Sequence, residues 1–229
     1  MKKLGVLGGM GPAAGAEFLV RLINQTPAKK DQEHIPAVLW SDPTVSDRST
    51  SLLNGDDLPW PKLREGILGL RTAGCDHIVI PCNTAHFWYD RLQELGVPIT
   101  HIVDSVADQL RASGVVNTTI GIMGTKATIS QGLYQNRLSA QGWNCITPTS
   151  SEMNELVQPA IDLIKSGKML LAEGMLNQVM GTLNDQGANA IVLGCTELPL
   201  AIRRTSFKNR PIVNSIDSLV KAVLNIQCV

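Results

Sequence analysis

Two segments of the chain are near copies of each other, and each carries one cysteine directly after a run of apolar, mostly β-branched residues. The first copy reads Ile-Val-Ile-Pro-Cys-Asn-Thr over residues 78–84, and the second reads Ile-Val-Leu-Gly-Cys-Thr-Glu over residues 191–197. Upstream in each copy, a second apolar segment contains paired glycine positions, at residues 4–9 and again at residues 120–125. Because these landmarks recur in the same order at nearly one spacing, the sequence predicts a duplicated fold.

A duplication of this length would give two lobes of about 100 to 115 residues, which is an ordinary size for a domain. The spacing of 113 residues between Cys82 and Cys195 places one cysteine in each lobe. We therefore expect an N-terminal lobe of residues 1–101 that is completed by residues 212–229, and a C-terminal lobe of residues 102–211.

Strand-like and helix-like segments alternate along both copies. Strands are expected at residues 3–7, 37–40, 77–80, 98–103, 119–123 and 190–193. Helices are expected around residues 18–23 and at 63–73, 131–138, 150–165 and 169–183, with a Thr-x-x-Glu capping box at 149–152 and a long polar loop at 42–57. The alternation predicts an α/β fold in which each lobe is a mainly parallel sheet flanked by helices. If a pseudo-twofold axis relates the lobes, both cysteine-bearing strand ends face one active site between them.

Composition argues against several classes of protein. Lys+Arg and Asp+Glu are balanced at 20 each, so no overall field attracts nucleic acid or an anionic membrane. Glycines interrupt the apolar N-terminal segment, which argues against a signal peptide, and no apolar run approaches the roughly 20 residues that span a bilayer. Five cysteines without a secretory signal indicate a reduced, cytoplasmic protein, in which Cys75, Cys145 and Cys228 are interpreted as structural.

Two thiols that face each other can invert a carbon acid, because one removes the proton and the other returns a proton to the opposite face. Reaction distances of about 3 to 3.5 Å on each side would place the sulfurs about 7 Å apart. Two thiolates at that separation repel by about 2.4 kcal/mol at an effective dielectric of about 20, so one thiolate opposite one thiol is favoured. Helices expected to begin after Cys82 and Cys195 would raise the thiolate fraction through their positive ends. The hydroxyls of Thr84 and Thr196, with nearby backbone amides, would hold a substrate carboxylate.

The same residues allow other interpretations. The turn at residues 8–11 lacks the glycine spacing of a dinucleotide-binding loop, and neither CxxC nor His-rich spacing accompanies the cysteines, so neither a nucleotide nor zinc is expected. A single cysteine behind an apolar strand is usually part of the core, but two in duplicated contexts reverse that expectation. We expect His86 to pack or to orient its neighbours. For Glu197, tuning of the adjacent thiol, binding of a substrate amine and capping of a helix all remain open.

Three motifs together resemble the cofactor-independent aspartate/glutamate racemase family: Pro-Cys-Asn-Thr-Ala-His at 81–86, Gly-Cys-Thr-Glu-Leu at 194–198 and Gly-Val-Leu-Gly-Gly-Met-Gly-Pro at 5–12. The resemblance implies a homodimer of two-lobed α/β chains that needs neither pyridoxal phosphate nor metal, with Cys82 and Cys195 as the catalytic acid/base pair. The implied substrate-binding residues are Asn83, Thr84, Ala85 and Thr196 for the α-carboxylate and α-amino groups, Arg48 and Lys165 for the side-chain carboxylate, and Met10 and Thr125 for closing the cleft.

Within that family, the sequence favours aspartate over glutamate as the substrate. Glutamate racemases usually open with Asp-Ser-Gly and carry a histidine after the second Cys-Thr, whereas this chain has Gly-Gly-Met and Cys-Thr-Glu at those places. The implied activity is interconversion of L- and D-aspartate. Glutamate and broad-specificity racemases, maleate isomerases and hydantoin racemases share the scaffold and stay as alternatives. A non-enzymatic sensor that only binds an amino acid is the alternative from another class.

Overall fold

The computed structural model describes residues 2–227 of the chain, so that Cys228, expected to be structural, lies outside the described part. The chain divides into two compact units, one formed by the residues up to Ser105 together with those from Ile216 onward, and the other by Val106–Ser215. Both boundaries fall four residues later than the lobe boundaries expected from the repeat. The first boundary falls after Ser105, inside the helix Ile102–Ala112, and the second falls after Ser215, the first residue of the helix Ser215–Gln227.

The first unit is built on a three-stranded parallel sheet with β1 (Leu4–Gly8) at its centre, between β2 (Ala37–Ser41) and β3 (His77–Val79). Its helices are α1 (Pro12–Gln25), η1 (Asp31–Glu33), α2 (Arg48–Asn54), α3 (Trp60–Thr72), η2 (Thr84–Trp88), α4 (Tyr89–Gln93) and α12 (Ser215–Gln227), and α5 (Ile102–Ala112) leads out of it. The strand expected at 98–103 is reduced to a single parallel bridge from Ile99 to Ile78, because α5 begins three residues later.

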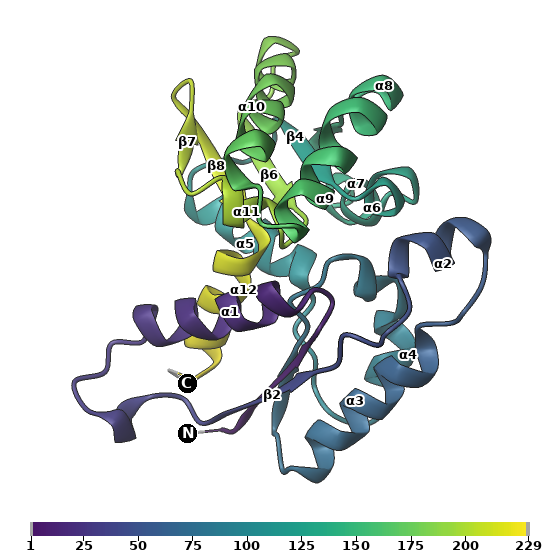
Figure 1. Ribbon diagram of the computed structural model, residues 1–229. Coiled ribbons are helices and arrows are strands. Elements are labelled where there is room, and N and C mark those ends of the chain that lie inside the picture. Colours follow the sequence, from purple (N-terminus) through teal and green to yellow (C-terminus); the bar gives the residue numbers. More distant parts are fainter. Residues whose placement is uncertain (1, 228–229) are drawn as a thin grey trace. The chain divides into compact units, whose positions relative to one another are not determined.

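Helix α12 returns the end of the chain to the first unit. Figure 1 shows α12 alongside α1, and the Arg21 guanidinium lies 2.9 Å from the Asp217 carboxylate between these two helices. Helix α1 begins with a proline in its first turn and buries Phe18 and Leu22 on one face. The sequence placed residues 212–229 with the N-terminal lobe, and the structure assigns the residues from Ile216 onward to this unit.

The second unit holds a five-stranded sheet in the order β5-β4-β6-β8-β7. The strands are β4 (Thr119–Gly124), β5 (Asn144–Ile146), β6 (Ala190–Gly194) and β8 (Arg210–Asn214), which are parallel, and the short β7 (Ser206–Phe207), which is antiparallel to β8. The helices are α6 (Lys126–Ser130), α7 (Leu133–Ser139), α8 (Ser150–Glu152), η3 (Met153–Val157), α9 (Gln158–Lys165), α10 (Met169–Asp185) and α11 (Leu198–Ala201). The antiparallel edge strand β7 was not expected from the sequence.

Backbone pairing in the two units repeats at the spacing seen in the sequence. In the first unit Ile78 bridges Ile99 in parallel, and in the second unit Ile191 pairs with Ile212 in parallel, each residue 113 positions after its counterpart. The sheet order β2-β1-β3 likewise corresponds to β5-β4-β6. The α/β fold with mainly parallel sheets is therefore confirmed.

Three helical expectations need correction or refinement. The polar loop expected at 42–57 contains α2, which is capped because the Asp47 carboxylate accepts a hydrogen bond from the Thr50 amide at 2.7 Å. The helix expected at 131–138 is α7, which begins at Leu133 because Gly132 has a left-handed φ of 72°, and the short helix α6 that precedes it was not expected. The capping box at Thr149 and Glu152 is confirmed. The helix that follows widens into the π-helical turn η3, which ends two residues before Pro159, whose ring would clash with the carbonyl one turn earlier in an ordinary helix.

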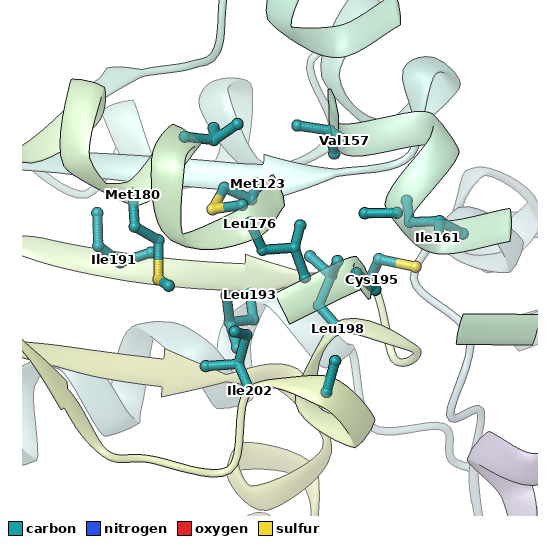
Figure 2. Packing of buried hydrophobic residues seen from close by; sticks show 14 of the residues in the cluster. Met123, Val157, Ile161, Leu176, Met180, Ile191, Leu193, Cys195, Leu198 and Ile202 are labelled. Carbon is teal, nitrogen blue, oxygen red and sulfur yellow. The ribbon is translucent and has the colours of Figure 1, made fainter. Parts of the chain in front are cut away.

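Each unit has its own apolar core. In the first unit, Leu63, Ile67 and Leu70 from α3 pack with residues from β1 and β3. In the second unit, residues from α9 and α10 pack against β6, and Figure 2 shows Cys195 at the edge of that cluster beside Ile161 and Leu198. None of the helices in residues 2–227 is long and apolar enough to cross a membrane.

Candidate active site

Cys82 lies in the turn that follows β3, at the carboxyl end of a buried strand. Its side chain is 5% exposed, and the next residues form the short 3-10 helix η2. Three of the predicted substrate-binding residues belong to this turn and are buried: Asn83, Thr84 and Ala85. The structure thus gathers four of the predicted site residues in one compact turn of the first unit.

Cys195 lies in the turn after β6, in the corresponding place of the second unit, and is 4% exposed. Its Sγ donates a hydrogen bond to Glu197 Oε2 at 3.0 Å. The Thr196 hydroxyl donates to the same oxygen at 3.4 Å, and both Thr196 and Glu197 are buried. A carboxylate therefore accepts hydrogen bonds from two consecutive side chains of the candidate site.

The environment of Cys195 favours the neutral thiol. Burial is the largest cause that raises the pKa of Cys195 well above its ordinary value, and the negative charge of Glu197 and its hydrogen bond with the thiol raise it further. The positive charge of Lys165 acts in the opposite direction. The sequence-based expectation that a helix start would increase the thiolate fraction is therefore wrong for Cys195. Helix α11 is only four residues long, so its dipole is small beside a buried carboxylate.

Lys165 and Thr125 belong to the same unit as Cys195. Lys165 is exposed at the end of α9, which packs against α11, the helix that follows the Cys195 turn. Thr125 caps α6, because its hydroxyl oxygen accepts a hydrogen bond from the Thr128 amide at 3.2 Å. Gly124 of β4 pairs with Gly194 of the neighbouring parallel strand β6. Thr125 follows Gly124 and Cys195 follows Gly194, so both residues come directly after the same end of the sheet.

Arg48 and Met10 belong to the first unit. Arg48 is the first residue of α2, and its Nη1 donates hydrogen bonds to the carbonyl oxygens of Val45 and Ser46, both at 3.1 Å. Its Nε is buried and has no hydrogen-bond partner within the described residues. Met10 is 3% exposed and packs in the core of this unit. The guanidinium of Arg48 is thus held by the chain on one side only, whereas Met10 is part of the packing.

Sequence reasoning missed one residue of this site and left another undecided. Glu197 was considered for three roles, and the structure gives it a hydrogen bond with the Cys195 thiol and no side-chain hydrogen bond that caps α11. No motif in the sequence singles out Tyr134. It is fully buried, and a Cβ built on Gly194 would lie 2.7 Å from its Cε2, so its ring lies against the residue before Cys195. No local pattern signals this contact, because 60 residues separate Gly194 from Tyr134.

The other described cysteines lie apart from these turns in the sequence. Cys75 is buried and Cys145 is half-buried, and both are free thiols whose pKa values are raised by burial. Within residues 2–227, no group of three or more His, Cys, Asp or Glu side chains is placed to hold a metal ion.

Comparison of the chain with models of protein families identifies the family to which it belongs. A family model described as Asp/Glu/Hydantoin racemase matches residues 7–223. The chain belongs to the Asp/Glu/hydantoin racemase family. The resemblance noted in the three sequence motifs is therefore confirmed at the level of this racemase family.

Other racemases align over most of this chain. A broad specificity amino-acid racemase from Bacillus subtilis is 27% identical over 229 residues, which cover 97% of this chain and 96% of that protein. A glutamate racemase from Corynebacterium glutamicum is 30% identical over 183 residues, which cover 74% of this chain and 63% of that protein. Among solved structures, Picrophilus torridus aspartate racemase has a TM-score of 0.85 at 29% identity, covering 99% of this chain and 94% of that one.

Proposed function

We propose that this protein is an amino-acid racemase that interconverts L- and D-aspartate by a two-base proton transfer at the α-carbon, with Cys82 and Cys195 as the two bases. The observation that carries the proposal is the repeated placement of one buried cysteine at the carboxyl end of equivalent strands, β3 and β6, in the two units. A protein that only binds an amino acid has no need of a thiol in both copies. Membership of a racemase family supports the same class of reaction.

The two thiols have different starting states in this mechanism. Because burial and Glu197 raise the pKa of Cys195, we assign the proton-donating thiol to Cys195 and the proton-accepting thiolate to Cys82. The Cys82 thiolate removes the α-proton, and the Cys195 thiol protonates the opposite face of the resulting carbanion. The centre is inverted, and the thiolate is then on Cys195.

Glu197 provides a route for the reverse assignment of charge. For the opposite enantiomer, Cys82 must begin as the thiol, with a proton taken from solvent, and Cys195 must begin as the thiolate. Its thiol proton already points at Glu197 Oε2 over 3.0 Å, so transfer to that oxygen leaves a thiolate beside a neutral carboxylic acid. A neutral acid next to the thiolate avoids placing two negative charges in one buried turn.

The substrate is held by groups from both cysteine turns. We assign the α-carboxylate and α-amino groups of aspartate to Asn83, Thr84, Ala85 and Thr196, which are buried beside the two cysteines in sequence. Arg48 and Lys165 are the cations assigned to the side-chain carboxylate. The buried Nε of Arg48 supports this, since it has no acceptor among residues 2–227 and a substrate carboxylate would supply one. Thr125 and Met10 are assigned to the walls of the closed site.

Aspartate is favoured over other substrates by two observations. Picrophilus torridus aspartate racemase, one of the structural relatives, has a TM-score of 0.85. This chain also has Glu197 at the place where the resemblance to the family leads us to expect histidine in a glutamate racemase. The broad specificity and glutamate racemases among the relatives make a wider substrate range the second candidate. Maleate isomerase and hydantoin racemase activities belong to the same alternative.

The test is incubation of purified protein, freed of metal and pyridoxal phosphate, with L-aspartate in deuterated water. We expect D-aspartate to form, with deuterium at the α-carbon of the product. A parallel panel of glutamate, alanine, maleate and a 5-substituted hydantoin ranks the alternatives by kcat/KM. Binding of aspartate without turnover of any of these substrates would identify an amino-acid sensor and overturn the proposal.

We also propose that the active form is a homodimer, as the family resemblance implies, and that it works in the cytoplasm, as five cysteines without a secretory signal indicate. Light scattering coupled to size-exclusion chromatography measures the mass directly. A mass of twice 24.7 kDa is expected, and a single-chain mass at assay concentration contradicts the dimer without affecting the proposed reaction.

A further inference from the structure

A buried histidine lies against the Cys82 turn and makes two directional hydrogen bonds. His86 is 3% exposed, and its Nδ1 lies 2.9 Å from the Cys82 carbonyl oxygen. On the other side of the ring, the Ile102 amide donates a hydrogen bond to Nε2 at 3.2 Å. The imidazole therefore connects the backbone of the cysteine turn with the backbone at the start of α5.

These two contacts require one particular form of the imidazole. Since the Ile102 amide can only donate, Nε2 must be the acceptor and carries no proton. Since a carbonyl oxygen can only accept, Nδ1 must carry the proton and donate to Cys82. His86 is therefore the neutral, Nδ1-protonated tautomer in this arrangement, with each ring nitrogen engaged.

Aromatic neighbours hold the ring in this orientation. His86 stacks on Tyr89 with ring centroids 6.1 Å apart, and the edge of His101 meets it at 4.9 Å. Tyr89 in turn is fixed by its hydroxyl, which donates to the Ile99 carbonyl oxygen at 3.1 Å. Because the His86 ring has so little freedom to rotate, its two hydrogen bonds hold the backbone groups that they join in fixed positions.

Ile102 has a particular place in the chain. It is the first residue of α5, and the chain passes from the first unit to the second within this helix. His86 thus ties the Cys82 turn to the helix by which the chain leaves the first unit.

The second cysteine turn has a matching connection made by a different residue. Ser215 is the first residue of α12, lies 113 positions after Ile102, and stands where the chain passes back to the first unit. Its side chain hydrogen-bonds with Tyr134, whose ring lies against Gly194, the residue before Cys195. Tyr134 connects this turn to α12 by packing at one end and by a hydrogen bond at the other.

We propose that His86 and Tyr134 are positioning residues that anchor the Cys82 and Cys195 turns to the first residues of α5 and α12, the two helices at which the chain passes between its units. Neither side chain exchanges a proton with substrate. Each one fixes the backbone of one thiol-bearing turn independently of the other. The inference goes beyond the proposed racemase activity and needs only that both thiols can react.

Reaction of each thiol with iodoacetamide tests the anchors without any assay of turnover. Native protein is alkylated for increasing times, and the modified fractions of the Cys82 and Cys195 peptides are measured separately by mass spectrometry. A buried thiol reacts through local opening, so loss of one anchoring hydrogen bond is expected to raise the rate at that cysteine by about three- to tenfold.

Two substitutions of His86 separate its two bonds. His86→Asn keeps a donor near the position of Nδ1 and loses the acceptor for the Ile102 amide, whereas His86→Gln keeps a group near Nε2 and loses the donor to Cys82. Both variants are expected to raise alkylation of Cys82 and to change that of Cys195 by less than about twofold. If His86→Gln alone raises the Cys82 rate, the link to α5 has no role and the proposal is overturned.

Tyr134→Phe tests the anchor of the Cys195 turn, because it keeps the ring against Gly194 and removes only the hydroxyl that hydrogen-bonds with Ser215. It is expected to raise alkylation of Cys195 and to leave Cys82 unchanged. His77→Gln is the matched control, since the His77 Nε2 hydrogen bond with Thr100 Oγ1 at 2.6 Å lies at the start of β3 and involves neither α5 nor α12. Equal increases at both cysteines in every variant would mean general loosening of the fold and would overturn the anchoring roles. Far-UV circular dichroism identifies any variant that does not fold, and the remaining variants still decide the question.

Discussion

The Cys195 thiol and the Glu197 carboxylate are joined by a hydrogen bond of 3.0 Å inside a buried turn, with the sulfur as donor. This relationship ties the charge of one thiol to the charge of one carboxylate two residues away. It also breaks the chemical symmetry of a duplicated fold, because the corresponding turn after Cys82 has Asn83 and Thr84 in place of Thr196 and Glu197. The proposed mechanism follows from that asymmetry.

Replacing Glu197 by glutamine should separate its charge from its hydrogen bond. Glu197→Gln keeps an oxygen acceptor and removes the negative charge that helps to raise the pKa of Cys195, so that pKa should fall. Racemisation should fall by about 100-fold or more if the carboxylate takes the thiol proton. The pH dependence of alkylation at Cys195, measured by peptide mass spectrometry, reports the pKa, with the Cys82 peptide as internal control. An unchanged Cys195 profile would show that the Glu197 charge does not act on this thiol.

The raised pKa of Cys195 also predicts a loss of stability in alkaline solution. Above the unfolded-state pKa of about 8.5, the unfolded chain releases a proton that the buried thiol retains, so the free energy of unfolding falls as pH rises. Below that pH the Cys195 thiol is protonated in both the folded and the unfolded state, so it makes no pH-dependent contribution to the free energy of unfolding. Thermal unfolding between about pH 7 and pH 10 should therefore show a steeper decline in Tm for the native protein than for Cys195→Ala.

Other buried groups contribute to the same alkaline decline and need a comparison. Burial also raises the pKa values of Cys75, Cys145 and Tyr134, and these remain in the Cys195→Ala variant. Only the difference between the two curves belongs to Cys195. Parallel curves would contradict the raised pKa.

Gly194 should tolerate no larger side chain. A Cβ at this position would lie 2.7 Å from Tyr134 Cε2 and 3.1 Å from the Met123 carbonyl oxygen, in a fully packed region. Gly194→Ala should lower the free energy of unfolding by about 1 to 3 kcal/mol through overpacking, as measured by urea denaturation. Gly174→Ala in α10 is the matched control, since nothing lies within 4 Å of its added Cβ, and it should raise stability by about 0.5 to 1 kcal/mol. A loss of stability in both variants would show that the Tyr134 contact is not the cause.

The duplicated α/β fold could be predicted because its signals are local. The Thr149–Glu152 capping box and the apolar strand runs each lie within a few residues of one another, and both elements form where they were expected. Helix α2 was missed because its sequence is polar, with Ser51 as its buried residue, so it has no apolar stripe for periodicity to detect. Its Asp47 cap was the available signal.

The positions of the two cysteines at strand ends were predictable from the sequence, whereas the electrostatics around Cys195 were not. Cys82 and Cys195 follow strands as the repeat indicated, but the protonation of Cys195 depends on burial and on the orientation of the Glu197 side chain. Sequence spacing gives neither quantity. The contact between Tyr134 and Gly194 could not be predicted from the local sequence either, because it depends on how α7 packs against the sheet.

Arg48 should determine selectivity for a substrate with a side-chain carboxylate. Its Nη1 donates hydrogen bonds to the carbonyls of Val45 and Ser46, and its Nε has no hydrogen-bond partner within the described residues, so the guanidinium keeps a donor for the side-chain carboxylate that the proposal assigns to it. Arg48→Ala should lower kcat/KM for aspartate by about 100-fold and for alanine by less than about fivefold. Arg48→Lys keeps the charge without the forked geometry and should fall between them. Equal losses for aspartate and alanine would remove Arg48 from the side-chain site.

The two cysteines should be separable by single substitutions, because each one serves one face of the α-carbon. Cys82→Ala and Cys195→Ala should each reduce racemisation by at least about 100-fold, since a general acid or base is lost in both directions of the reaction. The remaining thiol can still remove the proton from one enantiomer and return a deuteron to the same face. Each variant should therefore exchange the α-hydrogen of one enantiomer of aspartate without inverting it, and the two variants should act on opposite enantiomers. Nuclear magnetic resonance of L- and D-aspartate in deuterated water measures both exchanges, with Cys75→Ala as the control that keeps full activity. Exchange of the same enantiomer by both variants, or full racemisation by either, would contradict the two-base mechanism. The result also assigns each thiol to its enantiomer, which the duplicated sequence leaves open.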